Sequence, residues 1–240
     1  MLVEVCANSL ESAINAEKAG ADRIELCMEL GVGGLTPSAG LLKAVKENIK
    51  IPVHVLIRPR SGDFVYSDLE FDVMLKDVEN CIEIGVDGIV SGVLMPDFSI
   101  DIFRTKQLIA ASKGVYFTFH RAFDWVADPY EALCQLEQIG VNCILSSGQQ
   151  KKALEGIDLL YFLNQKAANC VIMPGSGIKR DNALLFKENG FSVIHFSGAT
   201  FQAKNANREN LSMCFMPFLD EDKTLVSDFK TIHDIVVRVK

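Results

Sequence analysis

The chain has 240 residues, of which 49% are hydrophobic and 23% are charged, and its formal net charge is −7. These values are ordinary for a globular protein, so they exclude the disordered and fibrous classes. The acidic balance argues against a nucleic-acid partner, which rewards a basic face. No apolar run approaches the roughly 20 residues of a membrane helix, so we expect no membrane partner either.

The first residues and the cysteines indicate the cellular compartment. The strand-like run Leu2-Val3-Glu4-Val5-Cys6 starts the chain directly, with no basic segment and apolar stretch that would indicate a signal peptide. Seven cysteines are present, and none are spaced as C-x-x-C. This pattern fits reduced, buried thiols better than a disulfide framework or a zinc ribbon. We therefore expect a cytoplasmic protein.

Strand-like and helical segments alternate along the chain. We expect eight strands, near 2–6, 23–28, 52–58, 88–94, 115–121, 143–147, 171–174 and 193–197, with helices between them. Gly20, Gly85, Gly140 and Gly190 each end a helical run shortly before a strand, and glycine suits the left-handed conformation of a helix C-cap. Eight β–α units in a chain of this length predict an α/β protein with a single-domain (β/α)₈ TIM barrel, with an open doubly wound sheet as the alternative.

The end of the chain departs from this repeat. Residues 1–200 would form the barrel core, and we expect residues 201–226 to be a loop insertion after the eighth strand. Its apolar part, Leu211 to Leu219, would pack on the barrel or on a second subunit. An amphipathic pattern over 228–239 predicts a C-terminal helix, so that residues 227–240 close the same domain.

Alternation within the strands predicts which side chains face the barrel interior, because successive residues of a strand point to opposite faces. The apolar residues should face the helices, which leaves the polar ones inside. The inward set is Glu4, Cys6, Glu25, Cys27, His54, Arg58, Thr118, His120, His195 and Ser197. Buried ionisable groups must be paired, hydrogen-bonded or wet, so this set forms either a satisfied polar network or a ligand pocket.

The loops after the strands favour a pocket at the C-terminal mouth of the barrel, where TIM barrels keep their sites. Arg58 and Arg60 follow the third strand, and Arg121 follows the fifth. Glycine-rich turns, Gly175-Ser176-Gly177 and Ser197-Gly198, follow strands seven and eight, where such turns commonly bind phosphate through backbone N–H groups. We therefore expect an anion site formed by these residues.

Several longer motifs resemble the CutC family, which is named for copper homeostasis. The matching stretches are Glu4-Val5-Cys6, Gly20 to Cys27, Gly33 to Ser38, Ile57 to Arg60 with Gly62-Asp63-Phe64, Thr118 to Asp124, Ser147-Gly148-Gln149, Ala153 to Gly156, Met173-Pro174-Gly175 and His195-Phe196-Ser197. The resemblance runs from residue 2 to about 200. Ser176, where the family usually carries glycine, and Met28-Glu29-Leu30 depart from its pattern.

The resemblance implies a cytoplasmic TIM barrel that is linked to copper tolerance and is often oligomeric, so we expect a homo-oligomer (dimer or tetramer). The cysteines proposed as Cu(I) ligands in the family match Cys6 and Cys27. Two thiolates suit Cu(I), and Met28, Met95 or Met173 could add a thioether ligand. The alternative is that these cysteines are ordinary core thiols, since free cysteine behaves as a small buried hydrophobe.

Two further functions remain open. The first is an enzyme acting on a small anionic or phosphorylated metabolite, with His120 as general acid or base, Glu25 as its partner, and Arg58, Arg60 and Arg121 holding the anion. The second is a divalent-metal hydrolase built on His54, His120, His195 and Glu25, because nitrogen and oxygen ligands suit zinc or manganese.

Overall fold

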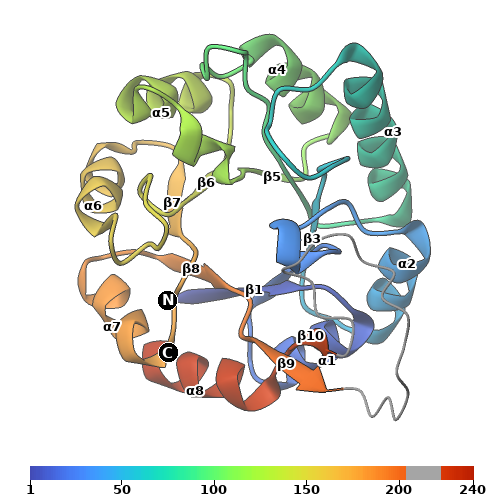
Figure 1. The fold of residues 1–240 in the computed structure, drawn as a ribbon, viewed down its shortest axis with the longest axis vertical. Coiled ribbons are helices and arrows are strands. Elements are labelled where there is room, and N and C mark those ends of the chain that lie inside the picture. Colours follow the sequence, from blue (N-terminus) through green and yellow to red (C-terminus); the bar gives the residue numbers. More distant parts are fainter. Residues whose placement is uncertain (204–222) are drawn as a thin grey trace.

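The computed structural model describes residues 1–203 and 223–240, in which helices surround a ring of parallel strands (Figure 1). The ring contains β1 (Leu2–Ala7), β2 (Arg23–Leu26), β3 (Val53–Leu56), β4 (Gly88–Ser91), β5 (Tyr116–Phe119), β6 (Cys143–Ser146), β7 (Val171–Pro174) and β8 (Val193–Phe196). The α-helices are α1 (Leu10–Lys18), α2 (Ala39–Asn48), α3 (Asp68–Ile84), α4 (Ile102–Ala111), α5 (Pro129–Gln138), α6 (Ile157–Lys166), α7 (Arg180–Glu188) and α8 (Phe229–Val239). Two 3₁₀ turns, η1 (Leu30–Val32) and η2 (Arg121–Trp125), lie in the loops after β2 and β5.

The strands close into a barrel. Neighbouring strands pair in the order β7-β6-β5-β4-β3-β2-β1-β8, and every pairing is parallel. A parallel bridge between Gly175 and His195 joins the two outer strands of that order. The (β/α)₈ barrel is therefore confirmed, and the open doubly wound sheet is wrong. None of the helices in the part of the chain described is long and apolar enough to cross a bilayer.

Local signals explain where the helices begin and end. The Ser67 hydroxyl accepts from the Glu70 amide while the Glu70 carboxylate accepts from the Ser67 amide, which is the capping box that starts α3. Asp128 caps α5 directly before Pro129. At the other end of α3, Gly85 takes a φ of 86°, a left-handed conformation that glycine adopts without a Cβ penalty.

The two faces of the strands form separate layers. Residues such as Val3, Ile24 and Val55 belong to the large apolar core between strands and helices. Inside the barrel, a small cluster near the C-terminal ends of the strands consists of Cys6, Cys27, Leu56 and Val90 with Leu30 against it. A second cluster consists of Cys143, Leu145, Met173 and Val193, with Leu2, Tyr116 and Val171 against it. Side chains therefore alternate between the two faces as the strand pattern predicts.

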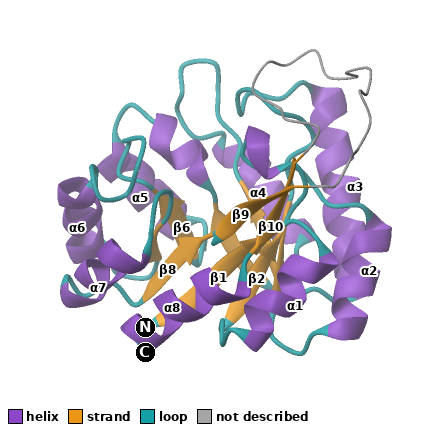
Figure 2. Ribbon diagram, turned by 60° about the horizontal axis from the view of Figure 1, so that its bottom comes forward, coloured by secondary structure: helices purple, strands orange, loops and turns teal. Residues whose placement is uncertain are grey.

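The chain after β8 differs from the expected loop over 201–226. The two ends of that segment form β9 (Ala199–Ala203) and β10 (Lys223–Ser227), which pair as an antiparallel ribbon (Figure 2). The five residues of β9 alternate between apolar and polar types, but their side chains are mostly exposed, so this short segment does not resemble the buried strands of the barrel. The apolar stretch Leu211 to Leu219 lies outside the described residues. Helix α8 follows the ribbon and packs against α7 and α1.

Candidate functional site

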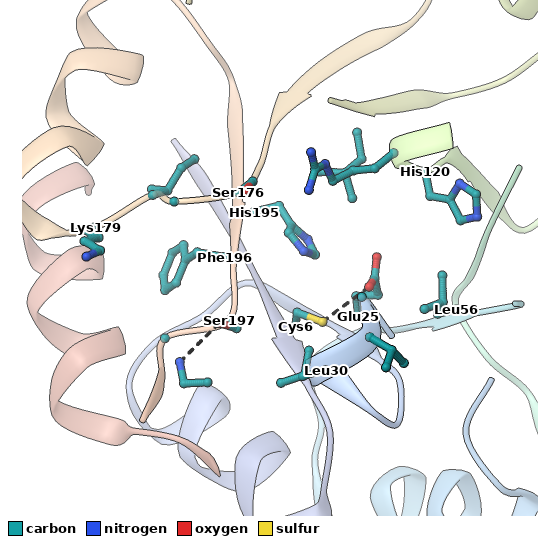
Figure 3. Close-up of a pocket in the computed structure, with 18 of the residues that line it drawn as sticks. Cys6, Glu25, Leu30, Leu56, His120, Ser176, Lys179, His195, Phe196 and Ser197 are labelled. Carbon is teal, nitrogen blue, oxygen red and sulfur yellow. Dashed lines mark hydrogen bonds between the residues drawn. The ribbon is translucent and has the colours of Figure 1, made fainter. Parts of the chain in front are cut away.

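A pocket of about 910 Å³ opens at the C-terminal ends of the barrel strands (Figure 3). Its lining includes Cys6, Glu25, Leu56, Arg58, Phe64, His120, Arg121, Trp125, Ser176, Gly177, Lys179, Arg180, His195, Ser197 and Gly198. The wall thus combines residues on the strand ends with residues from the loops that follow them. This is the end of a TIM barrel at which ligand sites are built.

Cys6, Glu25 and His195 meet at one place in this pocket. Cys6 and Glu25 are register partners on β1 and β2, and the next strand on the other side, β8, brings His195 beside β1. The Cys6 Sγ lies 3.5 Å from the Glu25 Oε1, and one potential ligand atom from each of the three residues lies within 4.8 Å of the others. Figure 3 shows the His195 ring turned toward the other two side chains. All three side chains are buried.

Cys27 lies directly behind Cys6. The two Sγ atoms are 3.4 Å apart, and Cys27 is fully buried while Cys6 lines the pocket. The hydrogen bond with the Cys27 thiol, together with burial, raises the pKa of Cys6 well above its ordinary value. The two cysteines that match the proposed Cu(I) ligands of the family are therefore in contact, and the surroundings of Cys6 favour its protonated thiol.

Glu4 organises the charges below the pocket. Its fully buried carboxylate accepts a hydrogen bond from the Arg23 Nε and lies 2.8 Å from the His195 Nδ1. Burial opposes ionisation of Glu4, but the hydrogen bond to His195 and the charge of Arg23 outweigh it and lower the Glu4 pKa to about 2. The carboxylate thus fixes the Nδ1 of His195 and leaves its Nε2 for the pocket.

Arg23 is an interior residue that the sequence analysis did not identify. It shares strand parity with Glu25, so the alternation of β2 places it inside as well. Its guanidinium lies over the Tyr116 ring, with 5.0 Å from Cζ to the ring centroid. An arginine at the start of a strand is easily taken for a surface residue, and only its parity indicates otherwise.

His120 occupies another part of the pocket wall. Its Nδ1 accepts a hydrogen bond from the Ala122 amide at 3.2 Å, and its buried Nε2 has no partner among the described residues. The ring packs against Phe64, with centroids 4.9 Å apart. Burial, followed by the charge of Arg58, lowers the pKa of His120 to about 3. His120 is therefore a neutral imidazole at physiological pH.

Glu25 has one satisfied and one orphaned oxygen. Oε1 accepts from the Cys6 thiol, whereas the buried Oε2 has no partner in the described structure. Burial raises the pKa of Glu25 above its ordinary value. Glu25 and His120 line the same pocket, as the acid–base hypothesis requires.

The arginines do not form the three-residue anion clamp that the sequence suggests. Arg58 donates from Nη1 to the carbonyls of Val32 and Gly34 and from Nη2 to that of Gly62, at 2.8–3.0 Å. It therefore ties two loops together. Arg60 is not among the pocket-lining residues and instead pairs with Glu70 and Asp63. The sequence places both arginines at the end of a strand, but it does not show that loop carbonyls and carboxylates bind their guanidinium groups in place of an anionic ligand.

Arg121 and the loops after β7 and β8 keep their place in the pocket. Arg121 lines it while donating from Nε to Asp124 at 2.7 Å and from Nη2 to Ser147 at 2.8 Å. Ser176, Gly177, Ser197 and Gly198 also line it, whereas Gly175 forms the barrel-closing bridge. Lys179 and Arg180, at the start of α7, also line the pocket. The strand and loop patterns in the sequence did not indicate these two cations.

The four ligands expected for a divalent-metal hydrolase do not converge. His54 lies lower in the barrel, with its Nδ1 3.8 Å from Glu4 and its ring 5.2 Å from that of Tyr116. Burial lowers the pKa of His54 to about 4. His120 is outside the group that Glu25 and His195 form with Cys6. The expected set is therefore wrong as a single site.

Of the possible thioether ligands, Met173 does not line the pocket and belongs to the cluster with Cys143, Leu145 and Val193, where its sulfur lies 3.6 Å from the Arg23 Nη2. Neither Met28 nor Met95 is among the residues that line the pocket. Among the described residues, no methionine lines the pocket and could add a thioether ligand to the Cys6–Cys27 pair.

Known proteins place this barrel in one family. The sequence pattern of the CutC family matches residues 1–200. A family protein CutC from Citrobacter koseri is 42% identical over 209 residues, which cover 87% of this chain and 84% of that protein. The crystal structure of a proposed copper homeostasis protein CutC from Streptococcus agalactiae superposes with a TM-score of 0.77 at 35% identity, covering 82% of this chain and 98% of that one.

More distant structures share the fold alone. A thiamine phosphate pyrophosphorylase from Pyrococcus furiosus has a TM-score of 0.62 at 13% identity, over 99% of this chain and 95% of that one. Such low identity carries no information on activity. The family pattern, by contrast, spans residues 1–200, and the identity to CutC proteins extends over most of the chain. The chain therefore belongs to the CutC family.

Proposed function

We propose that this protein acts in copper homeostasis by binding Cu(I) through Cys6 and Cys27. The observation that carries the proposal is the 3.4 Å separation of the two Sγ atoms at the floor of an open pocket. Two soft thiolates at this separation can contact one ion, and thiolates are the ligands that select Cu(I). The Streptococcus agalactiae relative, which is described as a copper homeostasis protein, supports the same role.

The surroundings of the two thiols determine how copper would reach them. The pocket opens onto Cys6, which is 6% exposed, whereas Cys27 is fully buried and does not line the pocket. Copper binding must displace the thiol protons, because the thiolate is the ligand. The hydrogen bond to Cys27 and burial raise the Cys6 pKa, so we expect Cu(I) affinity to increase with pH.

Anaerobic competition with a chromophoric Cu(I) chelator tests the proposal. Cys6→Ser and Cys27→Ser should each weaken Cu(I) binding by at least about tenfold, since each removes one of the two soft ligands. Cys134→Ser is the matched control, because Cys134 lies in α5, away from the pocket. Undetectable binding by the wild type, or an affinity unchanged from wild type in both the Cys6 and the Cys27 variant, would reject the copper site.

A second candidate is an enzyme that acts on a small anionic or phosphorylated metabolite. The pocket of about 910 Å³ is far larger than an ion requires and falls in the range that holds small organic molecules. Two buried polar atoms, Glu25 Oε2 and His120 Nε2, lack partners beside it and suit general acid–base chemistry. A cytoplasmic location and a homo-oligomeric state stay predictions from the sequence.

A further inference from the structure

The cluster at the pocket floor contains more than the two thiols of the proposed copper site. Glu25 and His195 lie beside Cys6, and the group of ligand atoms within 4.8 Å does not include Cys27. A carboxylate is a hard ligand that contributes little to Cu(I) selection. The Cys6–Cys27 pair therefore leaves the position of Glu25 and His195 unexplained.

The spacing of these atoms matches a tetrahedral cation. Zn²⁺ with sulfur at about 2.3 Å and a carboxylate oxygen at about 2.0 Å holds those two ligands about 3.5 Å apart. The Cys6 Sγ–Glu25 Oε1 distance is 3.5 Å. The three side chains come from β8, β1 and β2, adjacent strands whose register is set by main-chain pairing. Rigid strands therefore hold the ligand set close to a metal-binding geometry.

The atoms around the cluster complete the arrangement. Glu4 lies 2.8 Å from the His195 Nδ1, and Arg23 holds Glu4 from the other side. A histidine that binds metal commonly donates its other N–H to a carboxylate in this way. Glu25 is only 4% exposed, yet its Oε2 has no partner among the described residues. An orphaned buried acceptor is costly, and a cation bound by both oxygens of this carboxylate would satisfy it.

We propose that Cys6, Glu25 and His195 form a three-ligand site for a divalent cation, with Zn²⁺ as the best fit. One sulfur, one nitrogen and one oxygen ligand suit zinc, whereas Mg²⁺ and Ca²⁺ require oxygen ligands. The pocket leaves the fourth coordination position to water or to an oxygen of a bound ligand, as in catalytic zinc sites. This site shares Cys6 with the proposed Cu(I) site but does not need Cys27.

The wild-type protein can be tested with Co²⁺ as a spectroscopic substitute for Zn²⁺ under anaerobic, reducing conditions. We expect the visible bands of tetrahedral Co²⁺ together with a thiolate-to-cobalt charge-transfer band, and one equivalent of Zn²⁺ should abolish both. A spectrum with only octahedral features, or one without the charge-transfer band, would overturn the proposal. This measurement needs no substitution in the barrel interior.

Variants separate this site from the copper site. Glu25→Gln and His195→Gln should weaken Zn²⁺ binding in a chelator competition by at least about tenfold, as loss of a ligand does. Cys27→Ser should retain Zn²⁺ affinity within about threefold while losing Cu(I), and Glu25→Gln should retain Cu(I). His233→Gln is the control for His195, because His233 lies in α8 and stacks on Phe229.

The outcomes distinguish the two proposals. Loss of Zn²⁺ binding in Cys27→Ser equal to that in Cys6→Ser would show that the thiol pair binds both metals, which would refute the three-ligand site. Unchanged Zn²⁺ affinity in both Glu25→Gln and His195→Gln would also refute it. Far-UV circular dichroism of each variant establishes that the barrel is folded.

Discussion

His120 and His195 are buried histidines of one pocket, but their neighbours favour opposite charges. Burial alone would lower the His195 pKa, yet the charge of Glu25 and the contacts with Cys6 and Glu4 hold it well above its ordinary value. His120 has Arg58 nearby and no carboxylate among the causes of its shift, so burial lowers its pKa to about 3. The pKa values of the two histidines are thus shifted in opposite directions by their neighbours.

The low pKa of His120 predicts a pH dependence of stability. The unfolded chain takes up a proton near pH 6.5, whereas the folded chain does so only near pH 3, so the unfolded state binds more protons between these values. The contribution of His120 to the free energy of unfolding is therefore fully present above about pH 6.5, and it is lost as the pH falls from there toward pH 3. Between pH 7 and pH 5, the loss should be about 2 kcal/mol in the free energy of unfolding.

Urea denaturation of wild type and His120→Asn at pH 7, 6 and 5 measures this effect. Asparagine offers an acceptor for the Ala122 amide but does not titrate, so the variant should lose about 2 kcal/mol less over this range. If the free energy of unfolding falls equally with pH in both proteins, the pKa of His120 is not lowered as its environment suggests.

At the scale of single elements, β4 makes room for the histidines of its neighbours. A Cβ on Gly88 would lie 2.6 Å from the His54 ring, and one on Gly92, just after β4, would lie 2.7 Å from the His120 ring. The two interior positions next to these rings therefore carry no side chain, whereas Val90 between them belongs to the cluster inside the barrel. The pocket depends on these glycines, because larger residues there would displace two imidazoles.

The β9–β10 ribbon depends on contacts with α1 and β1. The Ser227 amide donates to the Ser12 Oγ at 3.0 Å, the Ser227 hydroxyl donates to the Cys6 carbonyl at 3.1 Å, and the Asn8 side chain donates to the Leu225 carbonyl at 3.0 Å. Since Ser227 is fully buried, its amide has no access to water if the Ser12 hydroxyl is removed. The ribbon is thus linked by one residue to the strand that carries Cys6.

Ser12→Ala should therefore lower the free energy of unfolding by about 1–3 kcal/mol, the cost of a buried donor without a partner. It should also speed hydrogen exchange of the Ser227 amide. Ser99→Ala is the control, because the Ser99 hydroxyl donates to the exposed Asp97 side chain, and it should change stability by less than about 0.5 kcal/mol. Equal effects of the two substitutions would contradict the role assigned to Ser12.

At the scale of the whole molecule, positively charged side chains gather at the pocket mouth although the net charge of the chain is negative. The chain has a formal net charge of −7, yet Arg121, Lys179 and Arg180 line the mouth of the pocket together with the loops after β7 and β8. Arg58 also lines it, but its guanidinium is occupied by loop carbonyls. An anionic metabolite would therefore meet Arg121 and the α7 end of the pocket.

Thermal-shift measurements with phosphorylated and carboxylated metabolites test this at the level of the molecule. A bound anion should raise Tm, and Arg121→Met should weaken its binding by about tenfold or more, as loss of a charge-assisted contact does. Arg60→Met is the matched control, because Arg60 pairs with Glu70 and does not line the pocket. His120→Asn should spare binding and, under the enzyme hypothesis, abolish any turnover. The anion site fails if no such metabolite stabilises wild type, or if Arg121→Met is stabilised equally.

Much of the fold follows from local chemistry. Period-two alternation assigned Glu4, Glu25, His120 and His195 to the barrel interior, and glycine C-caps marked the repeat. These signals arise within a few residues of each other, so they are readable without the rest of the chain. The same alternation placed Cys6 and Cys27 on one face of adjacent strands, where the structure brings them into contact.

Only the tertiary structure decided which partner each of these groups takes. Arg58 donates to loop carbonyls, Arg60 pairs with Glu70, and Arg23 pairs with Glu4 inside the barrel. His195 lies beside Cys6 because β8 pairs with β1, although these two strands are far apart in the chain. Strand parity specifies a face but not the neighbour across it. That neighbour depends on barrel closure and stagger, which no local pattern in the sequence encodes.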